Sequence, residues 1–444
     1  MESSAAEKCD EISNRISGLV LREPLRRGWL GGFALAFAFL MLLNAAILWL
    51  LIRGVGVWGV NVPVAWGFAI VNFVWWVGIG HAGTFISAIL LLLHQQWRTS
   101  INRFTEAMTI FAVACAGLFP LLHLGRPWVF YFLLPYPDTM DLWPQWRSPL
   151  VWDVFAVTTY LIVSLLFWFI GLMPDLAVMR DHAKRLWVRR LYGIGALGWR
   201  NSARHWNRHE TACLLLAGLA TPLVLSVHSV VSLDFSVAIV PGWHSTIFPP
   251  YFVAGAIFSG FAMVLTLLIP VRAIYGLRDV ITERHLDNAA KVMLSTGLIV
   301  ALGYATEHWM SWYSDDLYEG FLVHNRMAGA ASGVWWLVMI CNVGVAQALW
   351  FRRVRTSPVL LFITACLIQV GMWSERYLIV ITSLERDFLP SSWADFHATF
   401  WDWATLAGSM GLFFTLLFLF IRLLPMIAIH EMRKETVQEG EPQP

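Results

Sequence analysis

The chain has 444 residues, of which 58% are hydrophobic and only 14% are charged. Soluble domains carry about 25% charged residues, so this composition excludes a disordered chain, a nucleic-acid-binding domain and a secreted disulfide scaffold. Lysine and arginine number 31 and aspartate and glutamate 29, and the resulting net charge of +2 indicates no partner. The 25 tryptophans suit a protein that crosses two membrane interfaces. The composition therefore predicts an integral membrane protein.

Ten apolar runs are long enough to cross a bilayer as helices, since lipid cannot hydrogen-bond an exposed backbone. In chain order they are Trp29–Ile52, Val62–Leu93, Ile101–Leu122, Pro149–Leu172, Thr211–Leu233, Pro250–Val271, Ala289–Met310, Met327–Phe351, Pro358–Leu384 and Thr399–Ile421. The second run is longer than one span needs, so we expect it to be tilted or to extend beyond the membrane.

The distribution of positive charge predicts the orientation of these spans. The termini and the loops on their side hold 24 of the lysines and arginines, the opposite loops hold five, and Lys291 and Arg376 fall inside spans. Because cytoplasmic loops carry the excess of positive charge, both termini are predicted to be cytoplasmic. The chain is expected to be a multi-pass protein of the bacterial inner membrane.

Two sequence echoes predict paired halves. Met108 and Met293 each precede a histidine, His123 and His308, by fifteen residues, and two Thr-Ala-Cys stretches each lead to an Asp-Phe pair at the same distance. Both matches could also arise by chance in so apolar a chain. We predict an all-α polytopic fold of two four-helix bundles with one flanking helix at each end. The expected divisions are a cytoplasmic N-terminal segment (1–28), flanking helix 1 and its loop (29–60), the first bundle (61–240), the second bundle (241–390), flanking helix 10 (391–430) and a cytoplasmic tail (431–444).

The largest loop on the cytoplasmic side, Met179–Arg208, mixes basic residues with Leu186, Trp187 and Leu191. Such a segment could lie on the anionic inner leaflet as an amphipathic helix. A solvated basic loop fits the sequence equally well.

Ionisable side chains inside a span are costly and are therefore candidates for function. Those in the predicted spans are His81, Glu106, His123, Asp153, His228, Asp234, Glu307, His308, Glu375, Arg376 and Asp402. Glu375 and Arg376 are adjacent and so point about 100° apart on a helix. Each is therefore expected to need a partner elsewhere.

Three successive spans bring His123, Asp153 and Asp234 to one depth near the outer surface. Ser148-Pro149 has the form of a helix N-cap followed by proline, which places Asp153 one turn inside. A histidine beside carboxylates suits quinol oxidation, because these groups can accept the two hydroxyl protons. Each residue also has a structural interpretation: Asp234 as a loop residue, Asp153 as a helix-terminus contact and His123 as an interfacial histidine bonded to a carbonyl.

His81 lies deep in the second span among Gly78, Gly80 and Gly83, which permit close approach by a helix or a ligand. It could line a quinone pocket, relay protons or pack structurally. No second span offers a histidine pair matching His81 and His94, so a haem is not expected. The five cysteines are scattered without a C-x-x-C pair, so no metal or cluster site is expected from thiolates alone.

Several stretches together resemble a known family: His81-Ala82-Gly83-Thr84, Trp97 to Arg103, Glu106 to Thr109, His123-Leu124-Gly125-Arg126-Pro127-Trp128 and Arg147 to Asp153. The chain resembles the NrfD/polysulfide-reductase membrane-subunit family. Within it, the chain is most similar to the larger quinol-binding integral subunits of bacterial alternative complex III. The resemblance spans the second to ninth helices and implies two four-helix bundles with no haem or cluster bound by this chain itself.

The resemblance implies that the chain oxidises menaquinol or ubiquinol near the outer face. The expected partners are an iron–sulfur subunit, c-type cytochrome subunits, a paralogous membrane subunit and lipid, and no nucleic acid. On this interpretation His123, Asp153 and Asp234 are catalytic, while His81, Arg126 and Trp128 bind quinol. Candidates for proton transfer are Glu307, Glu375 and Asp402.

Three alternatives stay open at this point. A secondary ion- or proton-coupled transporter would also have ten spans, paired halves and intramembrane carboxylates. Such transporters break helices near the midplane, and here only Pro222 is expected to interrupt a span. The second alternative is a passive membrane anchor for redox partners, and the third is the paralogous subunit of the same complex, which does not bind quinol.

Overall fold

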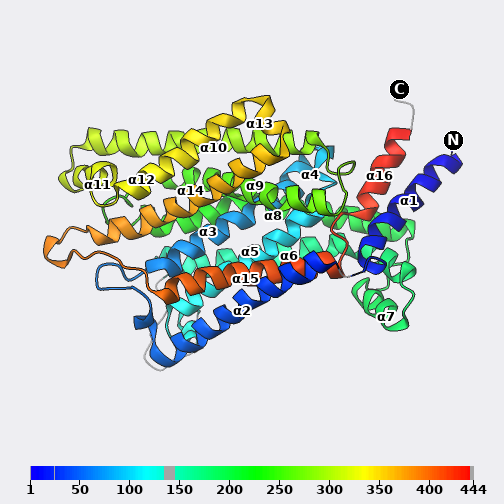
Figure 1. The fold of residues 1–444 in the computed structure, drawn as a ribbon, viewed down its shortest axis with the longest axis horizontal. Helices are drawn as coiled ribbons and strands as arrows, with labels where there is room; N and C mark the ends of the chain where they lie inside the picture. Colours follow the sequence, from blue (N-terminus) through cyan, green and yellow to red (C-terminus); the bar gives the residue numbers. More distant parts are fainter. Residues whose placement is uncertain (1, 25, 135–145, 441–444) are drawn as a thin grey trace.

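The computed structural model describes residues 2–24, 26–134 and 146–440. Within these residues, ten helical segments are long and apolar enough to cross a membrane, as predicted. They are α2 (Arg27–Arg53), α3 to α4 (Gly67–Leu92), α5 (Asn102–His123), α6 (Pro149–His182), α8 (Ala203–Ser236), α9 (Phe248–Ile274), α10 (Glu283–Ser314), α12 to η6 (Ser332–Trp350), α14 (Pro358–Glu385) and α15 (Phe400–Leu423). They run side by side along the long axis, and both termini lie at the same end (Figure 1). We call this the inner end, following the charge-based prediction, and the opposite end the outer end.

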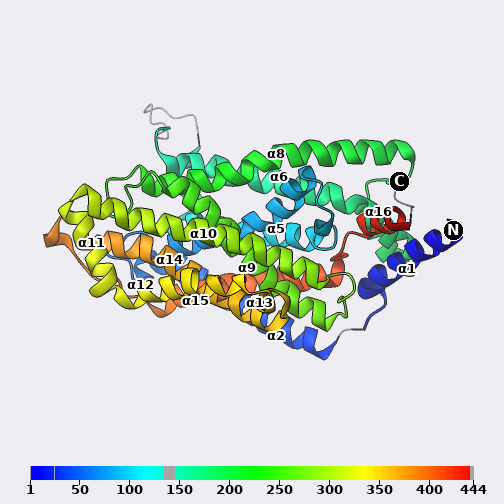
Figure 2. The same ribbon diagram turned by 90° about the horizontal axis from the view of Figure 1, so that it is seen from above.

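The remaining helical segments lie at the two ends of the spans. They are α1 (Glu2–Leu21), η1 (Val55–Val57), η3 (Gln96–Arg98), η4 (Pro127–Leu133), α7 (Leu186–Gly195), α11 (Leu317–Ala328), α13 (Arg352–Thr356), η7 (Pro390–Ser392) and α16 (Ile429–Gly440). At the inner end, α1 packs against α16 (Figure 2). The segment predicted as a cytoplasmic tail thus begins as an ordered helix.

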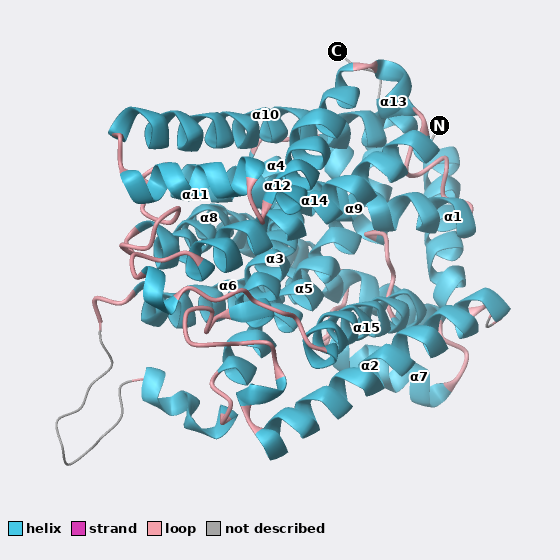
Figure 3. Ribbon diagram, turned by 60° about the vertical axis from the view of Figure 1, so that its left-hand side comes forward, coloured by secondary structure: helices cyan, strands magenta, loops and turns pink. Residues whose placement is uncertain are grey.

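Two spans form the centre of the molecule. Every residue of α3 (Gly67–Thr84) is buried, and α9 is nearly as buried along its length. Both helices are apolar all round, which is the pattern of a helix surrounded by other helices. α3 packs on α5, α9 and α14, and α9 packs on α8, α10 and α14. The other spans surround this central pair (Figure 3).

The helix contacts are arranged alike in the two predicted bundles. The first two spans of each bundle pack together, as α3 on α5 and as α9 on α10, and the last two do the same, as α6 on α8 and as α12 on α14. Across the boundary, α8 contacts α9 in the same way that α14 contacts α3. This pattern is the one expected of paired halves, although the residue bounds of the bundles stay a prediction.

The two flanking helices, α2 and α15, pack against one another along most of their length. The crossing depends on small residues of α15. A β-carbon on Gly408 would lie 2.6 Å from Leu43, and one on Gly411 would lie 2.5 Å from the backbone nitrogen of Leu40. Glycine at such positions lets two membrane helices approach backbone to backbone.

Three features of the spans differ from the sequence prediction. Pro222 does not interrupt its span, since α8 is continuous from Ala203 to Ser236. Membrane helices tolerate proline because neighbouring groups can compensate for the lost hydrogen bond. The irregular turns occur instead at Phe85–Ile89 and Met339–Gly344, which are π-helical, and the latter is followed by a 3-10 segment. Such π-turns have no proline signature and are frequent near functional sites.

The bounds of several spans also differ. The second span begins at Gly67 rather than Val62, and the eighth begins at Ser332 because Leu317–Ala328 forms a separate outer helix, α11. α6 continues ten residues past the predicted end at Leu172, to His182. This extension brings Asp175, expected in a loop, into a buried helical position.

Candidate functional site

Asp153 and Asp234 form a carboxyl pair at the outer end of the first bundle. Asp153 lies in the second turn of α6 and Asp234 near the end of α8, and these two helices pack together in opposite directions. Their carboxyl groups lie close enough to interact directly. Asp153 is only 7% exposed. The structure thus brings together two of the three predicted catalytic residues.

The pair has few other polar contacts. Neither oxygen of Asp153 nor Oδ1 of Asp234 has a hydrogen-bond partner among the described residues. Ser148 is the N-cap residue of α6, as predicted, but its side chain makes no capping bond. Asp153 therefore does not act as a helix cap. Because two ionised carboxylates in contact repel one another, the arrangement is suited to holding and releasing a proton.

The third predicted catalytic residue, His123, is the last residue of α5 and is half-buried. Its Nδ1 has no hydrogen-bond partner among the described residues, so no carbonyl holds the ring through that atom. The predicted quinol-binding residues Arg126 and Trp128 follow at η4 and are exposed, Trp128 to 60%. These two lie on the surface at the outer end rather than in the helix core.

A histidine pair lies deeper in the membrane. The His81 and His228 ring centroids are 4.6 Å apart, and the Tyr160 ring stacks on His81 at 5.5 Å. His81 Nδ1 bonds the Val77 carbonyl at 2.7 Å, which assigns the proton to that nitrogen when the ring is neutral. His81 Nε2 and both ring nitrogens of His228 have no partner within the described part of the chain.

His228 is absent from the predicted site residues, although it stands among the ionisable groups of the spans. The available signal is its position six residues before Asp234 on the same helix, which places the two about 9 Å apart along the axis. The histidine pair therefore lies less than two helical turns from the acid pair along α8.

The glycines around His81 serve helix packing, one of the two uses predicted for them. A β-carbon on Gly83 would lie 2.0 Å from the carbonyl oxygen of Thr105 on α5. The Tyr160 hydroxyl donates to the Gly80 carbonyl of α3 at 2.9 Å and contacts the Thr84 hydroxyl of the same helix at 2.7 Å. Two hydroxyl groups therefore lie beside the helical turns that carry His81.

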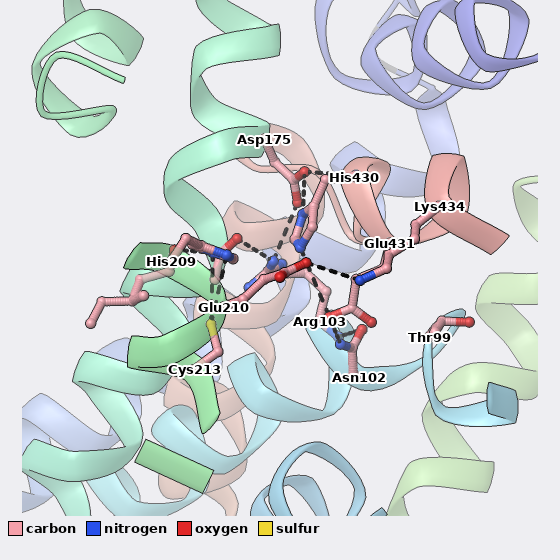
Figure 4. Close-up of polar contacts among 12 residues, drawn as sticks. Thr99, Asn102, Arg103, Asp175, His209, Glu210, Cys213, His430, Glu431 and Lys434 are labelled. Carbon is pink, nitrogen blue, oxygen red and sulfur yellow. Dashed lines mark hydrogen bonds and ion pairs between the residues drawn. The ribbon is translucent and has the colours of Figure 1, made fainter. Parts of the chain in front are cut away.

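A cavity of about 700 Å³ opens at the inner end, between the spans of the first bundle and α16. Arg103, only 1% exposed, forms ion pairs with Glu106 at 3.1 Å and with Asp175 at 3.3 Å (Figure 4). Asp175 in turn accepts hydrogen bonds from the backbone nitrogen and from Nδ1 of His430, at 3.1 and 3.0 Å. The volume of the cavity lies within the range of ligand cavities.

Further ion pairs hold α16 over this cavity. Glu431 pairs with Arg98 at 3.3 Å and accepts from Asn102 at 2.9 Å, and Lys434 pairs with Glu210 at 2.9 Å (Figure 4). The sequence-based prediction missed this cluster, because its members come from four distant segments. Only Glu106 was recognised as a buried acid.

The predicted proton-transfer residues of the second bundle differ in their surroundings. Glu307 pairs with Arg326 of α11 at 3.0 Å. Glu375 has two oxygens without a hydrogen-bond partner among the described residues, and its nearest cation is Arg376 itself, at 3.8 Å. For Glu375, the expected partner elsewhere is not found among the described residues, whereas Arg376 has one. The Arg376 guanidinium lies over the Phe252 ring, 4.2 Å from its centroid.

Glu307 and Glu375 both line a second, small cavity of about 20 Å³ beside Tyr251, Tyr304 and His308. This volume is sufficient for one water molecule.

Asp402, the third proton-transfer candidate, has a structural position instead. Its Oδ2 accepts hydrogen bonds from the backbone nitrogens of Gly59 and Thr399, both at 2.8 Å. Together with Thr399 it forms a capping box at the start of α15. Because these contacts hold the carboxylate as a helix cap, Asp402 is not part of the proposed proton route.

The outer helix α11 connects the second bundle to the loop before α9. Glu319 accepts from the backbone nitrogen of Gly242 at 2.8 Å, and burial raises the pKa of its carboxyl group. Burial also lowers the pKa of the Arg326 guanidinium, an effect that Glu307 opposes. Arg326 donates to Ser383 at 2.8 Å and to Thr382 at 3.0 Å, which fixes α11 on α14.

Among residues 2–24, 26–134 and 146–440, no group of three or more histidine, cysteine or acidic side chains is placed to hold a metal ion. The five cysteines are free thiols.

Together these features define a polytopic helical membrane protein with buried acid and histidine pairs at several depths. The family described as "Polysulphide reductase, NrfD" matches residues 56–386, and the chain belongs to this family. The match includes both aspartates of the outer pair and both histidines, while Asp402 and α16 lie outside it. The predicted family is confirmed.

Two curated relatives agree with this assignment. The chain is 29% identical over 259 residues to a putative membrane subunit of dimethyl sulfoxide reductase from Halobacterium salinarum, covering 55% of this chain and 52% of that protein. It thus spans about half the length of this relative. It is 21% identical over 399 residues to a subunit of selenate reductase from Mesobacillus selenatarsenatis, covering 86% of this chain and 90% of that protein. Both are named as subunits of reductases rather than of alternative complex III.

Proposed function

We propose that this chain is the quinol-oxidising membrane subunit of a redox-enzyme complex, with the Asp153–Asp234 pair as its proton acceptor. The observation that carries the proposal is that two carboxyl groups, one buried and one half-buried, lie close together at the outer end, where α6 packs on α8. His123 belongs to the same end of the first bundle and retains a ring nitrogen without a partner among the described residues. Carboxyl groups and histidine are the side chains that most often accept protons in catalysis.

In the proposed reaction, a menaquinol or ubiquinol enters from the lipid at the outer end. One hydroxyl proton passes to the aspartate pair and the other to His123, while two electrons leave to an iron–sulfur subunit. The products are the quinone, two protons released on the outer side and a partner reduced by two electrons. Arg126 and Trp128, exposed on η4, would then contact the quinol or the partner subunit.

The names of the relatives support a proposal for the electron acceptor. Because both are named as reductase subunits, we propose an iron–sulfur subunit of a reductase as the partner. An assembly with c-type cytochromes and a paralogous membrane subunit, as in alternative complex III, is the second candidate. Purification of the complex from its native membrane distinguishes the two, since only the latter contains covalently bound haem.

The test of the quinol site uses the variants Asp153→Asn and Asp234→Asn in the purified complex. We expect normal assembly and roughly a 100-fold loss of quinol-dependent electron transfer, because removing a general base costs about 10²–10⁴ in rate. Asp387→Asn is the matched control, since Asp387 follows the ninth span as Asp234 ends the fifth. Full activity in both test variants would contradict the proposal.

A specific observation also favours proton coupling. Polar groups extend from the inner cavity toward the histidine pair: Glu106 lines the cavity, Ser87 and Thr84 lie one and two helical turns from it toward His81 on the second span, and the Tyr160 hydroxyl lies 2.7 Å from that of Thr84. Tyr160 then stacks on His81. We propose that protons enter through the cavity and Glu106, reach His81 and His228, and continue along α8 to the acid pair. Glu307 and Glu375, with the small cavity between them, are candidates for a parallel route in the second bundle.

The coupling is tested by reconstituting the complex in proteoliposomes and measuring protons taken up inside per electron. Glu106→Gln is expected to abolish uptake while electron transfer continues at a reduced rate. Glu210→Gln is the control, because Glu210 also lines the cavity but pairs with Lys434 at the surface. Unchanged uptake in Glu106→Gln would exclude this route without affecting the quinol site.

The transporter alternative gains one argument from the structure, since the π-turns at Phe85–Ile89 and Met339–Gly344 do interrupt two spans. A purified chain that moves an ion or proton without any quinol would favour it. A complex that oxidises quinol while this chain carries no quinone would favour the paralogous, non-quinol-binding subunit.

A further inference from the structure

The inner surface carries a short amphipathic helix, α7 (Leu186–Gly195), whose apolar side chains face away from the protein. α7 follows the inner end of α6 and lies at the periphery of the molecule (Figure 1). The exposed fractions of Leu186, Trp187, Leu191 and Ile194 are 62%, 60%, 60% and 71%. A contiguous group of large exposed apolar side chains marks a surface that binds a membrane or another protein.

The contacts of α7 place it at the level where the spans end. On its inward face, the Tyr192 hydroxyl donates to the backbone carbonyl of Leu423 at 2.8 Å. Leu423 is the last residue of α15, the tenth span. The segment just after α7 packs Ala196 and Trp199 against the end of α6. The helix is thus held at the boundary between acyl chains and headgroups, where an interfacial helix lies.

The charges around α7 are almost all positive. Lys184 and Arg185 precede α7, Arg189 lies beside its apolar face and Arg190 lies within that face, and Asp181 is the one acidic residue between Met179 and Arg208. Asp181 forms its ion pair with Arg180, at 2.8 Å. Within the described residues no carboxylate lies in ion-pair distance of Lys184, Arg185 or Arg190. The cations are therefore available to a ligand outside the chain.

We propose that α7 and its flanking basic residues bind anionic phospholipids of the inner leaflet. The apolar side chains insert among the acyl chains, while the lysine and arginines bind the lipid phosphates. A solvated basic loop would leave four large apolar side chains in water. A protein partner would need acidic groups opposite these cations. The proposal rests on the membrane-spanning fold alone and is independent of the redox chemistry.

The first experiment identifies what touches the apolar face. The photoreactive amino acid benzoylphenylalanine is placed at Ile194 of the full chain in its native membrane, and at Leu302 as a control. Leu302 is 62% exposed within the span α10 and so marks ordinary lipid contact. We expect crosslinks to phospholipid at both positions, enriched in phosphatidylglycerol at Ile194. Crosslinks from Ile194 to a protein subunit, or to no lipid, would overturn the proposal.

The second experiment tests the role of charge. The complex is reconstituted in nanodiscs of phosphatidylcholine with phosphatidylglycerol, and the lipid that stays bound after detergent exchange is quantified by native mass spectrometry. The variant Lys184→Gln/Arg185→Gln/Arg190→Gln is expected to retain at least threefold less phosphatidylglycerol than the unmodified protein. The control Arg278→Gln/Arg352→Gln/Arg353→Gln removes three exposed cations from other inner loops. Equal loss in both variants would contradict a specific site on α7.

Discussion

The imidazole rings of His81 and His228 lie 4.6 Å apart, one on α3 and the other on α8, in the fully buried centre of the first bundle. His228 contributes no hydrogen bond to a described residue through either ring nitrogen. A buried polar group without a partner costs about 1–3 kcal/mol, so this residue lowers the stability of the fold. A histidine whose ring nitrogens bond no described residue can accept and release a proton, so His228 is suited to proton transfer.

This relationship predicts that His228→Phe makes the protein more stable and less active. Phenylalanine preserves the aromatic packing against Phe252 and removes two nitrogens that lack partners. We expect a rise of a few degrees in the thermal unfolding temperature, together with loss of proton uptake per electron. His308→Phe is the control and should lower the unfolding temperature, because His308 bonds the Tyr304 carbonyl and the Trp335 indole. Lower stability in His228→Phe would show that the ring has partners after all.

The close contact of α3 with α5 predicts that Gly83→Ala prevents folding. The added carbon would lie 2.0 Å from the Thr105 carbonyl oxygen and 2.1 Å from the Thr109 hydroxyl, and backbone cannot yield as a flexible side chain does. We expect no folded protein in fluorescence-detected size-exclusion chromatography. Gly117→Ala, on the neighbouring helix, meets no atom within 4 Å and should gain up to about 1 kcal/mol from helix propensity. A folded Gly83→Ala protein would contradict the packing of these two helices.

The inner ion cluster predicts that Arg103→Gln is strongly destabilising. Removing the guanidinium leaves Glu106 and Asp175 buried without their shared cation, and breaking a buried ion pair in this way costs about 3–5 kcal/mol. The unfolding temperature in detergent measures the effect. Arg15→Gln breaks the exposed ion pair with Asp279 and should cost less than about 1 kcal/mol. Similar effects of the two substitutions would mean that the cluster is solvated.

Asp402 caps α15, whereas Glu375 bonds no described residue through its carboxyl oxygens. Substitutions at these two positions are therefore expected to affect different properties of the protein. Asp402→Ala should lower the stability by about 0.5–2 kcal/mol, the usual cost of losing a helix cap, and leave the turnover of assembled complex unchanged. Glu375→Gln should leave the stability nearly unchanged, because no described residue bonds its carboxyl oxygens. Turnover and unfolding temperature, measured on the same samples, separate the two. Loss of turnover in Asp402→Ala would restore this residue as a candidate for proton transfer.

The spans and the outer acid pair could be predicted from the sequence for a simple physical reason. A span needs about 20 apolar residues, and alternating directions then determine which span ends share a membrane surface. That reasoning is sufficient to bring Asp153 and Asp234 to one depth. Their proximity additionally requires α6 and α8 to be neighbours, which two successive spans commonly are.

The inner cluster could not be predicted in this way. Asp175 and His430 are 255 residues apart, and their contact depends on where α16 returns after the last span. The π-turns at Phe85–Ile89 and Met339–Gly344 also have no local signature. The capping role of Asp402, in contrast, is predictable from the sequence, because Thr399 and Asp402 have the spacing of a capping box before an apolar run.

The pairing of α2 with α15 has a consequence for the synthesis of the protein. Of the ten described spans, α2 leaves the ribosome before the other nine, and its partner α15, which provides Gly408 and Gly411, leaves after them. During the insertion of the eight spans between them, α2 must stay in lipid without that partner. It is the most apolar of the ten spans and the least buried in the finished fold, so lipid is a suitable surrounding for it. Packing of α15 on α2 is therefore expected to be a late step in the assembly of these ten spans.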